Sequence, residues 1–204
     1  MKVEKYHLKS GTEFTKFEFI SEGPNGAIRK LIEFQNTNNP EVYNLAFGDL
    51  NPETQEIDDL SVSNNGDTEK VLGTVISAVY AFFNEYPNAF VYATGSTNAR
   101  TRLYRMGITK FYEQMKKDFY LYGQIGDDVV EFEIGTEYDG FLAQRKFYKY
   151  LKMKTVNLNN KNVPLVAIDK SLDKLKDKGM FPEKLARANK LLENAKLPVK
   201  RHYR

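Results

Sequence analysis

The chain has 204 residues, of which 41% are hydrophobic and 28% are charged, an ordinary composition for a globular protein. It has no cysteine and only two histidines, His7 and His202, near opposite ends. These counts argue against a Cys or Ser–His nucleophile system and against a zinc site, and we expect no metal site. There is no apolar run of about 18 residues and no signal-peptide core, so we expect a cytoplasmic protein that does not enter a membrane.

The formal net charge of +3 conceals an uneven distribution. Residues 153–204 carry 13 basic and 5 acidic residues, whereas residues 1–152 carry 17 basic and 22 acidic residues. We therefore expect an acidic domain over 1–152 and a basic tail over 153–204. The tail either binds nucleic acid or another anionic surface, or folds onto its own domain or that of a second copy. The second alternative explains both signs of charge.

The first third of the chain predicts a meander of four antiparallel strands. Short apolar or alternating runs are separated there by turn residues such as "EGPNG", "NTNNP" and "LNPET". The expected strands are residues 12–20, 27–35, 41–49 and 55–63.

The hydrophobic period then becomes helical. Apolar residues between Val71 and Phe83 predict a helix with Asp67 or Thr68 as its N-cap, ending at "EYPN". The run "AFVYATG" is typical of a strand buried on both faces.

A second helix is expected from Asn98 to about Met106, broken at Gly107 and resumed in "TKFYEQMKKDF". Two last strands are expected in "YLYGQI" and "VVEFEI". The order of elements predicts an α/β or α+β domain, with a mixed, mostly antiparallel sheet flanked by helices.

The tail begins with the polar linker "VNLNNKN" and continues with a short extended segment over 163–169. An amphipathic helix is expected to start at Pro182 and to end before Pro198. Such a helix cannot bury its apolar face alone, so it needs a docking surface.

The central motifs resemble the GNAT superfamily of acyl-CoA-dependent N-acyltransferases over roughly residues 14–135. The family's helix reads Asn-x-x-Ala-x-x-Leu-Tyr-x-x-x-Gly-Phe, and this chain has "NARTRLYRMGI". The same residue types follow in the same order at Asn98, Leu103, Tyr104, Gly107 and Ile108, with Thr101 in place of alanine, although Leu103 comes one residue and Gly107 two residues sooner than in the family pattern.

This resemblance implies acetyl-CoA or another acyl-CoA as cofactor, in a slot between two diverging parallel strands. The pyrophosphate would lie at Asn65, Gly66 and Thr68, where a helix begins. Gly95 would line the pantetheine slot, with Asn98 and Arg102 on the following helix.

One feature departs from the family pattern. No basic residue precedes Gly66, and Asp67 and Glu69 place negative charge beside the pyrophosphate site. One such repulsion costs about 4 kcal/mol before screening.

The resemblance also implies that Tyr104 protonates the leaving thiolate and that Glu56 or Asp58 is the base. Tyr104 could equally pack in the core, and Asp58 could belong to a solvated turn. The cluster of Arg100, Arg102 and Arg105 is either an anion clamp or the partner of acidic residues in 53–69.

The tail is similar to short neutralising peptides of bacterial toxin–antitoxin pairs, and Met153 stands where such a peptide would start. Three functions follow: a GNAT-like acyltransferase of a toxin–antitoxin or defence module with its tail docked, an inactive GNAT-like antitoxin or protein-binding module or homodimer, and a nucleic-acid binder acting through the tail. A tRNA partner fits poorly with the acidic domain. The acceptor substrate, and whether the tail docks in cis or is swapped between copies, stay open.

Overall fold

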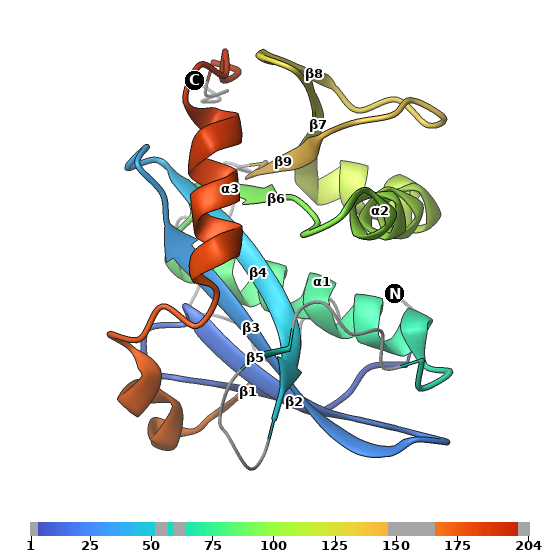
Figure 1. Ribbon diagram of the computed structural model, residues 1–204, viewed down its shortest axis with the longest axis vertical. Coiled ribbons are helices and arrows are strands. Elements are labelled where there is room, and N and C mark those ends of the chain that lie inside the picture. The colour runs from blue at the N-terminus through green and yellow to red at the C-terminus, as the bar shows by residue number, and fades with distance from the viewer. Residues whose placement is uncertain (1–3, 52–56, 59–63, 147–165, 200–204) are drawn as a thin grey trace.

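The computed structural model describes residues 4–51, 57–58, 64–146 and 166–199 (Figure 1). Within these ranges the chain forms one mixed sheet with helices on both faces, in agreement with the expected α+β class. The strands are β1 (Leu8–Ser10), β2 (Lys16–Gly23), β3 (Gly26–Asn36), β4 (Val42–Leu50), β5 (Ile57–Asp58), β6 (Phe90–Ala93), β7 (Phe119–Ile125), β8 (Asp128–Glu131), β9 (Gly140–Arg145) and β10 (Val166–Ile168). The helices are α1 (Thr68–Glu85), α2 (Asn98–Asp118), the 3₁₀ helix η2 (Lys170–Leu175) and α3 (Pro182–Leu192).

The predicted antiparallel meander is present in β2, β3 and β4. β3 and β4 match the predicted strands 27–35 and 41–49 to within one residue at each end, whereas β2 begins four residues later than the predicted 12–20. Of the predicted strand 55–63, the structure describes only β5, which pairs with the last two residues of β4. The other residues of that prediction, Glu56 among them, lie outside the described residues.

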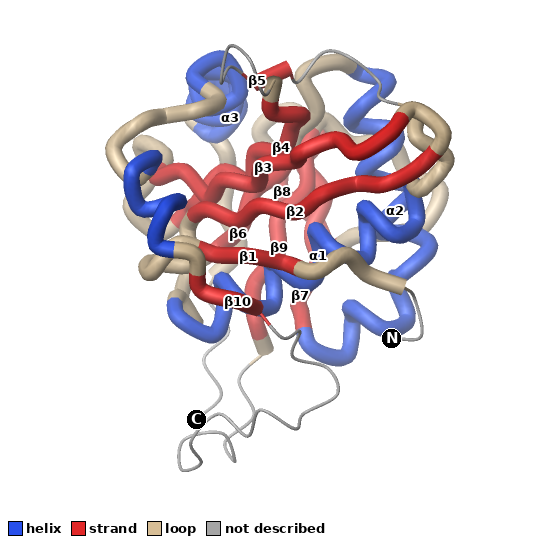
Figure 2. The backbone as a smooth tube through the Cα atoms, turned by 90° about the horizontal axis from the view of Figure 1, so that it is seen from below, coloured by secondary structure: helices blue, strands red, loops and turns tan. Residues whose placement is uncertain are grey.

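The sheet order is β10-β1-β2-β3-β4-β6-β9-β7-β8, with β5 beside β4 (Figure 2). β6 is parallel to β4, and β9, which we did not predict, lies between β6 and β7 and is antiparallel to both. The sequence did not predict β9, because the strand has only six residues and its last two, Gln144 and Arg145, interrupt the apolar run. Its central place in the sheet depends on strand pairing, which a local pattern does not encode.

Helices α1 and α2 lie on the same face of the sheet, which we call the first face. α1 starts after Asp67, as predicted. The predicted break of α2 at Gly107 is wrong, because the helix runs without interruption to Asp118. One glycine costs a helix only about 1 kcal/mol, and Gly107 packs closely against Leu72 of α1.

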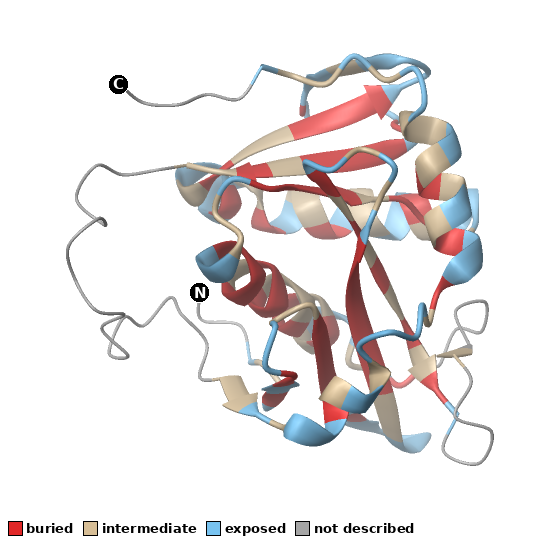
Figure 3. Ribbon diagram, turned by 90° about the vertical axis from the view of Figure 1, so that its left-hand side faces the viewer, coloured by how far each residue is buried: buried red, intermediate tan, exposed pale blue. Residues whose placement is uncertain are grey.

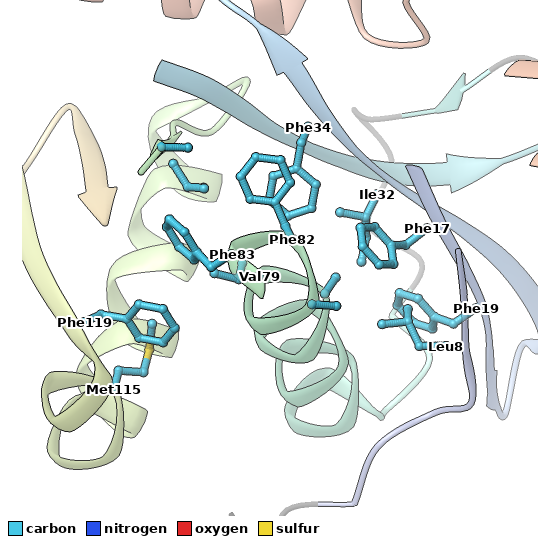
Figure 4. Close-up of a cluster of buried hydrophobic side chains, with 14 of the residues drawn as sticks. Leu8, Phe17, Phe19, Ile32, Phe34, Val79, Phe82, Phe83, Met115 and Phe119 are labelled. Atoms are coloured by element: carbon cyan, nitrogen blue, oxygen red, sulfur yellow. The ribbon is translucent and has the colours of Figure 1, made fainter. Parts of the chain in front are cut away.

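The main core lies between α1 and the first face (Figures 3 and 4). Alternate residues of β2 and β3 point toward the helix, among them Phe17, Phe19 and Phe34, as strand geometry requires. Phe82 of α1 stacks on Phe34 with ring centroids 4.1 Å apart. This aromatic packing fixes α1 against the meander.

The tail contacts the rest of the chain from β10 to the residues after α3. β10 pairs in parallel with β1, from Leu8 opposite Val166 to Ser10 opposite Ile168. α3 lies on the opposite side of the sheet from α1, the second face, where Ala188 is fully buried (Figure 1). The amphipathic helix predicted from Pro182 is therefore confirmed, and its apolar stripe is covered.

A candidate ligand cleft between two diverging strands

β4 and β6 start side by side and then diverge (Figure 1). They pair only from Val42 opposite Phe90 to Asn44 opposite Tyr92, although β4 continues to Leu50. β5 pairs with β4 only at Asp49 and Leu50. Among the described residues, Leu45–Gly48 therefore has no strand partner on the edge of β4 that faces β6.

The turn after β6 leads the chain away from β4. The Thr94 hydroxyl donates to the carbonyl of Asp139 (2.8 Å), and the Gly95 N–H donates to the Thr101 hydroxyl (3.2 Å). The Thr97 hydroxyl caps α2 by accepting from the N–H of Arg100. These bonds direct the chain into α2 immediately after Ala93 and keep the gap open.

A cavity of about 130 Å³ lies beside this gap on the first face. Its walls are almost entirely apolar and come from both strands, both helices, β7 and β9. From β4 and α1 the lining includes Leu45, Phe47, Leu72, Val75 and Ile76, several of them only half-buried. We did not single out these residues from the sequence, because the helical and alternating patterns that contain them are also those of an ordinary core.

Tyr104 and Gly107 line the cavity from α2. Tyr104 is half-buried and also packs against the cluster of Phe132, Tyr138 and Phe141. Tyr104, the candidate acid, therefore lies in the cavity wall. It also packs against a hydrophobic cluster, which was the alternative interpretation of this residue. Gly107 packs against Leu72, which lines the same cavity from α1.

We expect Gly107→Ala to stabilise the fold and to weaken ligand binding in the cleft. A Cβ at this position would lie 3.1 Å from a Leu72 methyl group, which can rotate away into the cavity. Alanine in a helix interior is about 1 kcal/mol better than glycine. Urea unfolding and ligand titration of the same variant measure both effects, and lower stability without a loss of affinity would contradict this role of Gly107.

The loop before α1 holds the β2–β3 hairpin. The buried Asn65 side chain accepts from the N–H of Asn25 (2.9 Å) and donates to the Ser21 hydroxyl (2.9 Å) and the Gly26 carbonyl (3.1 Å). Gly66 has a φ of +74°, a conformation that glycine adopts at no steric cost. Asn65 and Gly66, two of the candidate cofactor-binding residues, therefore stabilise the local backbone. Thr68 is the exposed first residue of α1.

The carboxylate of Asp67 is turned toward β2 and the N-terminal segment. It accepts hydrogen bonds from the hydroxyls of Ser21 (2.6 Å) and Tyr6 (2.7 Å) and makes no cap bond to α1. Burial and this carboxylate raise the pKa of the Tyr6 phenol, which keeps it a donor. Glu69 forms an ion pair with Lys110 of α2. Both acidic residues of the loop are thus partnered.

The remaining candidates are spread around the start of α2. Asn98 and Arg102 are exposed and do not line the cavity. Arg105 donates to the Thr136 carbonyl (3.2 Å) and pairs with Glu137 (3.3 Å), whereas half of the acidic residues in 53–69, its predicted partners, lie outside the described residues. The remaining candidate, Asp58, lies away from α2, in β5, where it pairs with Asp49 of β4.

The tail reaches the cleft from the second face. The Lys184 ammonium group of α3, only 2% exposed, donates to the Phe47 carbonyl (2.5 Å). Because the Phe90 N–H donates to the Glu41 carbonyl, every second β4 residue from Glu41 to Phe47 directs its main chain toward β6. Lys184 therefore occupies the open edge of β4, a contact that we did not predict.

The sequence profile of DUF6934, described as a family of unknown function, matches residues 2–146. No curated protein and no solved structure matches the chain. In the described ranges no helix is long and apolar enough to cross a membrane, and no three His, Cys, Asp or Glu side chains gather as metal ligands.

Proposed function

The chain belongs to DUF6934, a family of unknown function, and we propose its function from the geometry of the cleft. We propose that the protein is an N-acyltransferase that resembles the GNAT superfamily and binds an acyl-CoA between β4 and β6. The observation that carries the proposal is the divergence of these parallel strands beside an apolar cavity. An apolar cavity of about 150 Å³ takes up a molecule of the size of benzene. A cavity of about 130 Å³ therefore suits a short acyl chain.

The open edge of β4 supports the polar part of the ligand. The main chain of Leu45 and of Phe47 faces the gap, and no described strand pairs with this edge of β4 between Asn44 and Asp49. Buried main-chain groups need hydrogen-bond partners. The amides of a pantetheine arm provide such partners.

The start of α1 supports the diphosphate part. The amides of the first turn have no capping side chain, because Asp67 bonds to Tyr6 and Ser21. A helix N-terminus with free amides attracts anions. The pairing of Glu69 with Lys110 reduces the repulsion inferred from the sequence.

Tyr104 is the proposed acid, and Glu56 and Asp58 are the candidate bases. When bound, an acyl-CoA supplies a thioester carbonyl, whose C–S bond breaks as the acceptor amine forms a C–N bond. The Tyr104 hydroxyl holds the proton that the departing thiolate takes up, and a carboxylate removes the proton of the amine.

Titration calorimetry with acetyl-CoA and butanoyl-CoA tests the binding claim. The titration uses the intact chain and the Lys184→Met variant, in which the Phe47 carbonyl is released. We expect both to bind, the variant more tightly. Absence of heat with either protein at about 1 mM ligand would overturn the proposal.

We expect Tyr104→Phe to lower the rate of CoA release to an amine mixture about 100-fold, with an unchanged Kd. The matched control is Tyr112→Phe, on the same helix, whose ring packs 5.5 Å from that of Phe132. A thiol assay measures the rate. Equal rates for the two variants would remove Tyr104 as the acid.

A further inference from the structure

The two faces of the central sheet differ in chemistry. On the first face, most buried positions of β2, β3 and β4 are aromatic or aliphatic, with Ser21 and Lys30 as the polar exceptions toward one end of the strands. On the second face, the buried positions of the sheet include many polar side chains: Lys16, Glu18, Glu33, Gln35, Asn44, Gln124 and Gln144. A polar buried surface is typical of interfaces that form and dissociate rather than of a permanent core.

The segment that covers this second face, residues 166–197, is separate from the family domain. The DUF6934 match ends at residue 146, and residues 147–165 connect it to β10. We call residues 166–197 the docking segment. It consists of the strand β10, the helix η2 and the amphipathic helix α3.

Polar side chains of the sheet bind the main chain of the docking segment. Lys16 donates to the Lys178 carbonyl (2.7 Å), and Glu33 accepts from the Met180 N–H (2.9 Å). On the same face, but toward the other end of the strand order, Gln124 of β7 donates to the Leu191 carbonyl (2.6 Å). Recognition of main-chain groups together with parallel strand addition at β1 is a mode of peptide binding.

Lys16 and Glu33 are the pair of charges on this surface that most needs hydrogen-bond partners. They form an ion pair whose side chains are nearly fully buried beneath the docking segment. Burial raises the pKa of Glu33, while Lys16 and the Met180 N–H counteract the shift. A buried ion pair is stable only when its remaining hydrogen-bonding capacity is used, and the main chain at residues 178 and 180 uses it.

Under α3 the fit is incomplete. Gln144 is 0% exposed, and neither polar atom of its amide has a hydrogen-bond partner among the described residues. The Oδ1 atom of Asn44 also lacks one within those residues. Such unpaired groups cost free energy that water recovers when the helix leaves.

Charge adds a long-range attraction. The docking segment has 8 basic and 5 acidic residues, whereas residues 1–152 have an acidic excess. Exposed ion pairs hold it at three points: Lys9 with Asp169, Glu13 with Lys176 and Asp128 with Lys196. Pairs of this kind contribute little to affinity but favour encounter.

We propose that the second face and the β1 edge form a peptide-recognition site, whose occupant is the docking segment, held reversibly and exchangeable for the same segment of another polypeptide. Its ligand class is a basic peptide with a short extended stretch, a turn and an amphipathic helix that has a small residue at its centre. This inference does not depend on acyl-CoA binding.

The test uses the full chain with a specific protease site introduced between residues 147 and 165. After cleavage, a fluorescent peptide of residues 164–199 is added and its anisotropy is measured. We expect the peptide to replace the cleaved segment. In the uncleaved chain the tethered segment competes at an effective concentration of order mM, so the peptide should bind there only at much higher concentration. Unfolding upon cleavage, or failure of the peptide to exchange, would show that the segment is an integral part of the domain.

Two matched pairs of variants locate the site. In the peptide, Ala188→Glu introduces a charge at a fully buried position and should abolish binding, whereas Ala186→Glu at an exposed position should retain it. In the domain, Glu33→Gln should weaken binding about tenfold, because the charge-assisted bond to Met180 is lost. Glu18→Gln removes a carboxylate of β2 that is paired with Arg29 of β3, and it should leave binding unchanged. Equal binding within either pair would overturn the assignment.

Discussion

Replacing Phe82 by alanine is expected to lower the free energy of unfolding by about 4 kcal/mol. Phe82 is 0% exposed and stacks on the ring of Phe34 (Figure 4). It also stacks on Tyr86 and meets Tyr43 edge-on. Removal of the ring leaves a cavity that neighbouring aromatic rings, fixed on rigid elements, cannot fill.

Urea unfolding followed by circular dichroism measures this loss. The control is Leu103→Ala on α2, which is 43% exposed and should change stability by less than about 0.5 kcal/mol. A loss below about 2 kcal/mol for Phe82→Ala would mean that α1 adjusts on the meander more easily than the packing indicates.

Gly95→Ala is expected to cost about 3 kcal/mol of stability. A Cβ at this position would lie 2.3 Å from the main-chain nitrogen of Thr101 and 2.7 Å from the carbonyl carbon of Arg100. These atoms belong to the first turn of α2 and cannot rotate away as a side chain would. The strain can be relieved only by moving the start of α2, and with it Tyr104.

The matched control for this variant is Gly179→Ala, where an added Cβ meets nothing within 4 Å. It should leave stability within about 0.5 kcal/mol. Thermal or urea unfolding of both variants measures the difference. Equal stability of the two variants would show that the turn after β6 yields without cost.

Gly95 also shows what a sequence conveys about a turn and what it does not. The motif predicted a tight connection from strand to helix, and the structure confirms it. A left-handed backbone conformation is the usual reason for glycine in a turn, but Gly95 is not among the residues with positive φ. The reason here is the close approach of two main-chain segments, which depends on the pairing of distant residues.

The meander, α1 and the tail helix were predictable because each follows from a local period of apolar residues. The identity of the strand beside β6 was not. The resemblance implied a slot between two diverging parallel strands without naming them, and in the structure these strands are β4 and β6. Nothing in the sequence of β4 distinguishes the half that pairs with β6 from the half that diverges.

The candidate site was predicted in part for the same reason. Tyr104 lines the cavity, and the helix motif pointed to it. Asn65 and Asp67 instead bind the β2–β3 hairpin and Tyr6, partners 40 and 61 residues away in sequence. Asn98 and Arg102 stay at the surface.

If an acyl-CoA binds between β4 and β6 as proposed, the bond from Lys184 to the Phe47 carbonyl makes the docking segment a negative effector of the cleft. A ligand that takes this carbonyl and a docked Lys184 cannot both be accommodated, so thermodynamic reciprocity requires each to lower the affinity of the other by the same factor. The Kd of a cleft ligand for the intact chain then equals its Kd for the open domain divided by the fraction of open molecules. The ratio of the two constants, measured on the intact chain and on the domain after cleavage between residues 147 and 165 and removal of the released segment, gives that fraction directly.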